Sequence, residues 1–349
     1  MDAMTLSDIR VHLEDVEDQI LAPQAAHSRR TRGRGVPDEE SLVRTAYQRD
    51  RDRIIHSQAF RRLKHKTQVF MAPLGDHYAT RLSHTLEVAQ IARTIARALR
   101  LNEDLAEAIV LAHDLGHAPF GHAGEDILTR LNPDGFNHTE QSYRVVEFLE
   151  KGGQGLNLTW EVLDGIRGHS KPRAGIHVST GHTASTLEGQ IVRYADVIAY
   201  INHDIADAVR AAIIAPEALP VESTDVLGER HSARINTMVC DVILSSQDLT
   251  SIRMSDAVLN ASNILREWMF QRVYTNPDVK GEDGRAEMML TQLYHHFEQN
   301  PASLPRFFIA NVRNESLHQR ITDYMAGMTD RYAIALFEQI YVPRLWALV

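Results

Sequence analysis

The chain has 349 residues, of which 44% are apolar and 24% charged, close to the average for globular proteins. This length predicts about two domains and allows a full hydrophobic core without disulfide staples. The net charge is −9, and the single cysteine, Cys240, excludes an intramolecular disulfide and cysteine-based metal clusters, as is typical of a reducing compartment.

The N-terminal residues read MDAMTLSDIRVHLEDVEDQ, an acidic stretch that lacks the basic and apolar parts of a secretory signal. Uninterrupted apolar runs are only a few residues long, whereas a membrane-spanning helix needs roughly 18. We therefore expect a cytoplasmic protein that has no membrane partner.

A basic segment follows the N-terminal residues. Residues 29–66 hold 12 of the 37 Lys and Arg residues and only 5 of the 46 acidic ones, so the rest carries 25 basic against 41 acidic residues. Such a segment can face an anion such as phosphate. A solvated arginine-rich loop and helix explains the composition equally well.

Helical periodicity dominates the chain, because proline is sparse and long alternating β-branched runs are absent. In chain order, helices are expected over 41–64, 82–99, 103–115, 123–131, 139–150, 187–209, 255–274, 285–298 and 316–340. Loops marked by Gly, Pro, Ser or Asn are expected at 28–38, 151–158, 168–184, 275–286 and 300–305. Asn102 is a plausible N-cap, and Gly116 fits a helix end.

This pattern predicts an all-α fold. We expect a basic and partly flexible N-terminal segment over 1–40, a helical core over 41–215, and a C-terminal helical region over 216–349 that packs on the core.

Histidine is unusually frequent, at 18 residues, and the segment 113–125 (HDLGHAPFGHAGE) mixes it with Asp, Glu and Gly. His113 and Asp114 close a predicted helix, where both side chains can reach one ion if other helices supply more ligands. His84 and Asp196 are the candidates for those ligands. Imidazole and carboxylate together suit Mn, Fe, Co, Ni or Zn, and Mg less well. A lone helical histidine is more often a surface or hydrogen-bonded core residue, but glycines beside this run let backbone approach a ligand.

The predicted helix over 187–209 supports the same site. Its polar side chains fall within roughly 100° of arc, opposite the apolar stripe; they are Asp196, Tyr200, His203, Asp204 and Asp207. A solvated acidic face is the simpler explanation of this helix alone. Together with the 113–125 segment, it favours a wet cleft that holds a metal ion.

At this point the chain resembles the HD-domain phosphohydrolases, and more narrowly the bacterial deoxyguanosine triphosphate triphosphohydrolase-like proteins. The family pattern H…HD…D is met by His84, His113, Asp114 and Asp196. Longer blocks are more specific, and they include RDRDRIIHSQAFRRLKHKTQVF (49–70), AHDLGHAPFGHAGE (112–125), EGQIVRYADVIAYINHDIADA (188–208) and LREWMFQRVY (265–274). The likeness extends over roughly 40–349.

The resemblance implies an HD-domain core with a C-terminal helical extension, and a reaction. Such enzymes cleave a deoxynucleoside triphosphate (dGTP or several dNTPs) into deoxynucleoside and tripolyphosphate, which contributes to control of the dNTP pool. The four residues of the pattern would hold a divalent metal ion, such as Mn²⁺, Mg²⁺, Fe, Co or Ni. His122 would be the general base or acid, and Glu125, at i+3 on the same helix face, would orient it. His138 would be a second acid that protonates the leaving 5′-oxygen.

The resemblance also implies substrate contacts, which fall on Gln68, Val69, Arg81, His117, Tyr200, Asp204, Lys171 and Arg173. Arg81, His117 and the two loop residues Lys171 and Arg173 would contact phosphates. Gln68 would read the sugar 3′-hydroxyl, and Val69 would press on C2′ and so reject ribonucleotides. Tyr200 and Asp204 would face the sugar.

Family members also form rings, so a homo-oligomer such as a hexamer is expected, with a regulatory dNTP or single-stranded DNA as possible further partners. Two alternatives stay open. One is an HD nucleotidase or phosphodiesterase that acts on a monophosphate or a cyclic nucleotide. The other is a nucleotide-binding or single-strand-binding protein without catalytic activity. Base preference, native metal and subunit number are not fixed by the sequence.

Overall fold

The computed structural model describes residues 6–68, 78–169, 176, 182–277, 281–310 and 313–343. Within these ranges the regular structure is helical, apart from isolated β-bridges, which confirms the predicted all-α fold. The α-helices are α1 (Leu6–Ile20), α2 (Ala46–Ile55), α3 (Gln58–Arg62), α4 (Arg81–Ala98), α5 (Glu103–His113), α6 (Gly121–Leu131), α7 (His138–Arg144), α8 (Glu150–Gly153), α9 (Trp160–Gly168), α10 (Leu187–Arg210), α11 (Val221–Leu227), α12 (His231–Ser245), α13 (Asp256–Met269), α14 (Asp283–Gln299), α15 (Arg306–Ala310), α16 (Leu317–Ala326) and α17 (Asp330–Tyr341). Shorter 3₁₀ and π turns lie between them, at Ser28–Arg30, Leu63–His65, Val145–Leu149, Pro216–Ala218, Phe270–Tyr274 and Pro301–Ser303.

Two of the predicted long helices are divided, and the prediction of single helices there is wrong. The 41–64 segment breaks between α2 and α3, where the Ser57 hydroxyl caps α3 by accepting from the Phe60 backbone N–H. The 316–340 segment breaks between α16 and α17, where Thr329 caps α17 in the same way. A hydroxyl that satisfies free N–H groups starts a new helix even where the apolar spacing continues across the break.

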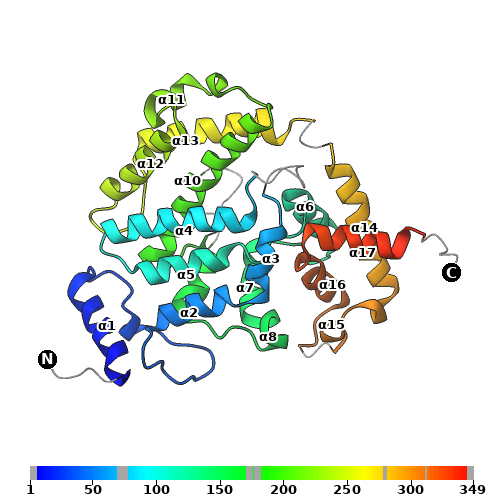
Figure 1. Cartoon of the computed structure of the whole chain (residues 1–349), viewed down its shortest axis with the longest axis horizontal. Helices are drawn as coiled ribbons and strands as arrows, with labels where there is room; N and C mark the ends of the chain where they lie inside the picture. Colours follow the sequence, from blue (N-terminus) through cyan, green and yellow to red (C-terminus); the bar gives the residue numbers. More distant parts are fainter. Residues whose placement is uncertain are drawn as a thin grey trace, which may run out of the picture.

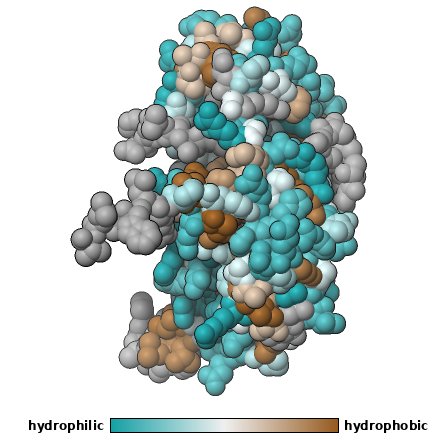
Figure 2. Space-filling view, turned by 90° about the vertical axis from the view of Figure 1, so that its right-hand side faces the viewer, coloured by the Kyte–Doolittle hydropathy of each residue, from teal (hydrophilic) through white to brown (hydrophobic). Residues whose placement is uncertain are grey.

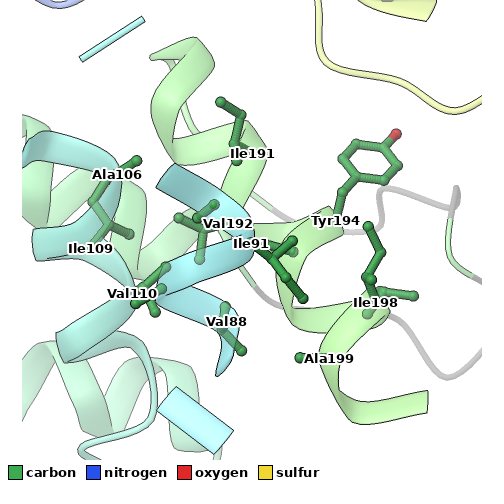
Figure 3. Close-up of a cluster of buried hydrophobic side chains, with 14 of the residues drawn as sticks. Val88, Ile91, Ala106, Ile109, Val110, Ile191, Val192, Tyr194, Ile198 and Ala199 are labelled. Atoms are coloured by element: carbon green, nitrogen blue, oxygen red, sulfur yellow. The ribbon is translucent and has the colours of Figure 1, made fainter. Parts of the chain in front are cut away.

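Three helices form the centre of the molecule. α4 and α5 lie side by side and α10 packs across both of them (Figure 1). Their contact is filled by aliphatic side chains, among them Val88 and Ile91 from α4, Ile109 from α5, and Val192 and Ile198 from α10 (Figure 3). This burial holds the ends of the three helices in fixed relative positions, as the hydrophobic effect dictates.

The predicted caps of α5 are confirmed at its start and refined at its end. The Asn102 side chain accepts from the Leu105 backbone N–H at 3.1 Å. The helix ends at His113, and Asp114 is the C-cap residue. The helix thus ends at two adjacent polar side chains that are both buried.

The C-terminal helices form two groups. α11, α12 and α13 lie together over one end of α10, whereas α14 packs beside α6 and is joined there by α16 and α17 (Figure 1). A second hydrophobic cluster joins Ile127 and Leu128 of α6 to Leu290 and Tyr294 of α14 and to Met325 of α16. The position of α6 therefore depends on the C-terminal region.

Two buried polar side chains tie the same region to the loop between α5 and α6. The Lys66 amino group donates to the backbone carbonyls of His117 and, at 2.8 Å, of Ala326. The Asp330 carboxylate, at the start of α17, accepts from the backbone N–H of Phe120 at 2.9 Å. Phe120 has a left-handed backbone (φ 62°), so this hydrogen bond holds a strained residue in place.

Lys66 makes stability depend on pH. Burial lowers the pKa of Lys66 to about 7, whereas an unfolded lysine titrates near ~10.4. Between these values the unfolded chain binds more protons, so the free energy of unfolding rises with pH, by at most about 1.4 kcal/mol per unit. We expect the wild type to gain stability over Lys66→Met between about pH 7 and pH 9 in urea denaturation.

The matched control for this prediction is Lys64→Met, because Lys64 is exposed and two residues away. The stability difference between wild type and Lys64→Met should not change with pH. Equal pH dependence of the two variants would contradict the role of Lys66.

The basic segment is paired internally to a large extent. The predicted flexible N-terminal part contains α1, and ion pairs link the segment to carboxylates of the same chain. They include Arg29–Asp18, Arg34–Asp50, Arg44–Asp52, Arg49–Asp38, Arg51–Asp104 and Arg53–Asp38. Such pairs fit the alternative of a solvated arginine-rich segment, and binding of a regulatory nucleotide or DNA there stays a prediction.

The face of the molecule that carries α14 and α17 is largely hydrophilic, with small separate hydrophobic patches (Figure 2). Among the described helices, none combines the length and the apolarity that crossing a membrane requires.

Candidate metal centre and active site

The predicted ligands converge from three helices. His84 lies in the first turn of α4, His113 ends α5, Asp114 follows it, and Asp196 lies in the middle of α10. Ligand atoms of His84, His113 and Asp114 lie within 4.8 Å of one another, and all three residues are buried. The Nε2 atom of His84 is 3.3 Å from Asp196 Oδ1. Because α4, α5 and α10 share the core, their packing alone brings these four side chains together.

The donor atoms fit a divalent ion. The Nδ1–H of His113 donates to the Val110 carbonyl at 2.6 Å, so the ring nitrogen that faces Asp114 Oδ1, at 3.1 Å, is Nε2. That Nε2 is buried and makes no hydrogen bond to a described residue. Burial lowers the pKa of His84 to about 4, so this imidazole is neutral at physiological pH. Neutral imidazoles and carboxylates are the form in which these residues bind transition metals, so the residues present fit the ion.

The Asp114 carboxylate lies beside three basic side chains: Arg81, His113 and His117. Burial alone would raise the pKa of its carboxyl, but His113, His117 and Arg81 together hold it well below its usual range. Arg81, at the start of α4, donates to Asp114 Oδ2 at 3.0 Å. Arg81, the predicted phosphate ligand, therefore lies beside the metal site, and one N–H of its guanidinium is already bonded to Asp114.

A second pair of imidazoles faces Glu125, which comes from α6. The Glu125 carboxylate binds Nδ1 of His117 and, at 3.1 Å, Nδ1 of His138. The two rings are stacked, with centroids 4.0 Å apart. Burial would raise the pKa of Glu125, but the two histidines hold it well below its usual range. The predicted acid His138 is thus oriented by a carboxylate.

In this structure Glu125 is not paired with His122, its predicted partner. His122 is exposed in the first turn of α6, and its ring makes no hydrogen bond or ion pair with Glu125. The spacing i, i+3 allows the pair, but it is worth only a few tenths of a kcal/mol on an exposed helix. The buried His117 and the half-buried His138, both from outside the helix, attract Glu125 more strongly, because less water screens them than on an exposed helix face.

Gly116 explains how His138 comes close to the HD segment. A Cβ atom on Gly116 would lie 2.1 Å from the Ser142 backbone nitrogen, so only glycine lets α7 approach this closely. The Ser142 hydroxyl completes the contact, because it donates to the His113 carbonyl at 2.6 Å. Gly116, which the sequence predicted as the end of a helix, therefore also permits the close contact with α7.

His169 is a site residue that the sequence analysis did not select. Its ring lies edge-on to His113, with centroids 5.0 Å apart, and 5.6 Å from that of His138. Its Nδ1–H donates to the Ile166 carbonyl, and burial lowers its pKa to about 3. The C-cap residue of α9 thus contributes a neutral imidazole, and the only sequence signal was its place at the start of a histidine-bearing loop.

The predicted sugar contacts lie around the same centre where the structure describes them. The backbone carbonyl of Gln68 lies beside Gly121 at the start of α6, and its side-chain Oε1 is buried and makes no hydrogen bond to a described residue. Tyr200 is half-buried on α10, and Asp204 is buried one turn further, where it accepts from the Tyr274 hydroxyl. The predicted contacts Val69, Lys171 and Arg173 lie outside the described residues.

Comparison with known proteins agrees with this geometry. The HD domain family matches residues 81–201, which carry all four candidate ligands, and the phosphohydrolase-associated domain matches residues 252–339. The chain is 52% identical over 338 residues to a deoxyguanosinetriphosphate triphosphohydrolase-like protein of Caldanaerobacter subterraneus subsp. tengcongensis, covering 97% of each. Proteins with the same description from Desulfatibacillum aliphaticivorans and Geobacter sulfurreducens are 47% and 40% identical, covering 96% and 95% of this chain and 98% and 97% of theirs. The chain belongs to the deoxyguanosinetriphosphate triphosphohydrolase-like family of HD-domain phosphohydrolases.

Proposed function

We propose that this protein hydrolyses deoxynucleoside triphosphates to a deoxynucleoside and intact tripolyphosphate, as a cytoplasmic enzyme that limits the dNTP pool. The observation that carries the proposal is the convergence of His84, His113, Asp114 and Asp196 beside a carboxylate-oriented histidine pair. The names of the full-length relatives point to the same substrate class.

The metal site would bind the α-phosphate. His84, His113, Asp114 and Asp196 would hold the ion, for which Mn²⁺, Mg²⁺, Fe, Co and Ni remain candidates. When bound, such an ion supplies charge neutralisation at a phosphate oxygen and a position for water. Arg81 lies beside the site with buried N–H groups, one of which, Nε–H, has no hydrogen bond to a described residue. It would donate to a phosphate oxygen there.

The proton transfers fall to the histidines. His117 has both ring nitrogens beside carboxylates, Nδ1 at Glu125 and Nε2 3.1 Å from Asp114 Oδ1, and its ring would lie against the phosphates beside the metal site. His138 gives only Nδ1 to Glu125, and no described residue binds its Nε2. Protonated, it would give the Nε2 proton to the leaving 5′-oxygen as the P–O bond breaks. His122 would act as the general base that takes a proton from the attacking water.

Gln68 would read the sugar. Its Oε1 makes no hydrogen bond to a described residue and would accept a hydrogen bond from the 3′-hydroxyl. Val69 against C2′ remains the proposed barrier to ribonucleotides.

The test of the reaction is product analysis by ³¹P NMR. The Mn²⁺-loaded protein is incubated with each dNTP singly and with all four together. Intact tripolyphosphate supports the proposal, and product from the mixture alone would indicate a regulatory dNTP. Pyrophosphate or orthophosphate would indicate another HD hydrolase, and no product with any metal would favour a binding protein.

His122→Ala is expected to lower kcat about a hundredfold or more, since general acid–base groups contribute that much. Mn²⁺ content and nucleotide affinity should stay at the wild-type level, because His122 is exposed and lies outside the ligand cluster. Steady-state kinetics, metal analysis and equilibrium binding measure the three quantities. Unchanged kcat would remove His122 from the mechanism.

A further inference from the structure

The metal ligand His84 has a buried neighbour on its far side. Its Nδ1 atom lies 2.8 Å from Nε2 of His203, and the rings meet edge-on, with centroids 5.0 Å apart. His84 comes from α4, whereas His203 comes from α10, seven residues after Asp196. Two ring nitrogens at this distance share one proton.

The direction of that hydrogen bond decides whether His84 can bind an ion. If Nδ1–H of His84 donates to His203, then Nε2 of His84 is unprotonated and can bind an ion beside Asp196. If His203 donates instead, the His84 proton stays on Nε2, in the position that the ion needs. Only the first direction is compatible with the metal site.

The surroundings of His203 favour the first direction. Its other ring nitrogen, Nδ1, is 2.8 Å from Asp204 Oδ1, and a carboxylate attracts the ring proton to that side. The second oxygen of Asp204 accepts from the Tyr274 hydroxyl. His203 and Asp204 are 5% and 3% exposed, so little water competes for these groups.

We propose that His203 is a positioning residue for the metal ligand His84, and that Asp204 and Tyr274 hold it in the required tautomer. The inference rests on the metal site of the proposed function but not on the identity of the nucleotide. Asp204 then serves the metal site as well as its proposed contact with the sugar.

This chain of contacts also links two parts of the fold. Tyr274 ends the π turn Phe270–Tyr274, which lies in the segment matched by the phosphohydrolase-associated domain. A side chain of the C-terminal region therefore reaches, through Asp204 and His203, to a ligand in the HD domain. Affinity for the ion should respond to a change at Tyr274 although its hydroxyl binds Asp204 and not a ligand.

The test measures Mn²⁺ affinity of metal-stripped full-length protein without nucleotide, by electron paramagnetic resonance of free Mn²⁺. His203→Ala should raise the Kd about 10- to 100-fold, the usual effect of losing a partner of a ligating histidine. His203→Gln should recover most of the affinity, because the glutamine Oε1 can accept a hydrogen bond from His84 Nδ1–H. Tyr274→Phe should raise the Kd in the same direction by less.

Asn202→Ala is the matched control. Asn202 is equally buried on α10, but its side chain binds the Ile198 carbonyl and the Arg234 guanidinium, away from His84. It should lower the melting temperature of the metal-free protein and leave the Mn²⁺ Kd unchanged.

Three outcomes would overturn the inference. They are an unchanged Kd in His203→Ala, a Kd in His203→Gln as weak as in His203→Ala, and an equal loss in Asn202→Ala. A wild type without Mn²⁺ affinity would overturn the metal site itself. Failure to release tripolyphosphate would concern only the proposed reaction, since no nucleotide is present in this test.

Discussion

Asp114→Ala is expected to lose bound Mn²⁺ and to lower kcat/KM at least about a thousandfold, equivalent to ~4 kcal/mol of transition-state stabilisation. Asp114 lies between the two histidine groups, 3.1 Å from both His113 Nε2 and His117 Nε2. Its removal therefore takes away a proposed metal ligand and the carboxylate that faces His117. Metal analysis of the purified variant and steady-state kinetics measure the two losses.

Asp114→Ala should also destabilise the folded protein, because it leaves the buried Arg81 guanidinium without its carboxylate partner. Breaking a buried ion pair costs about 3–5 kcal/mol, so the melting temperature should fall as well. Asp114→Asn keeps the shape and one oxygen acceptor toward Arg81. Comparison of Asp114→Asn with Asp114→Ala separates the loss of metal from the loss of stability, because Asp114→Asn should restore much of the stability but not the metal content.

Asp323→Asn is the matched control for loss of a buried carboxylate. Asp323 is bound by Arg144 in the C-terminal region, at 2.7 Å, and is as buried as Asp114. It should destabilise the protein and keep the metal. A fully active Asp114→Ala enzyme, or one that keeps its Mn²⁺, would show that the ion site is placed wrongly.

Three of the four candidate ligands could be predicted from a local pattern in the sequence. His113 and Asp114 stand at a helix end marked by Gly116, and Asp196 lies on the polar face of a strongly amphipathic helix. His84 needed the family pattern, because nothing local distinguishes it from other helical histidines. Helix packing then places the four together, as the apolar stripes require.

The partners of Glu125 could not be predicted in the same way. His117 precedes α6 and His138 begins α7, so their contact with Glu125 depends on how loops fold over the helix. His169 and His203 were missed or left without a role for the same reason. Each contact joins residues far apart in the chain, and sequence periodicity describes only neighbours within one element.

The contacts between the C-terminal region and the α5–α6 loop could not be predicted from the sequence pattern either. Lys66 and Asp330 look like ordinary charged residues of a basic segment and of a helix start. Burial and hydrogen bonds to backbone groups of the α5–α6 loop give them their role. A prediction of that role would need the tertiary fold first.

Glu125→Gln is expected to lower kcat about 10²- to 10⁴-fold while Mn²⁺ affinity stays near that of the wild type. Glu125 accepts hydrogen bonds from two imidazoles, one on each oxygen. Glutamine has only one acceptor oxygen, and its amide group would face the second Nδ1–H with its own protons. One of His117 and His138 must then rotate or move its proton to Nε2, which removes the oriented tautomer.

Asp126→Asn neutralises the adjacent, exposed carboxylate of the same helix and should leave kcat unchanged. Steady-state kinetics and Mn²⁺ titration of both variants check the expectation. Wild-type kcat in Glu125→Gln would exclude Glu125 from the orientation of any catalytic histidine.

A double-mutant comparison decides which histidine Glu125 serves during the reaction. Groups that act as one unit give non-additive losses, because the first substitution already removes what the second would remove. The contacts in this structure predict that Glu125→Gln adds little to His138→Ala, and that its effect multiplies with that of His122→Ala. The reverse result would mean that Glu125 turns to His122 once nucleotide is bound, and that the pairing expected from the i, i+3 spacing forms only in the complex.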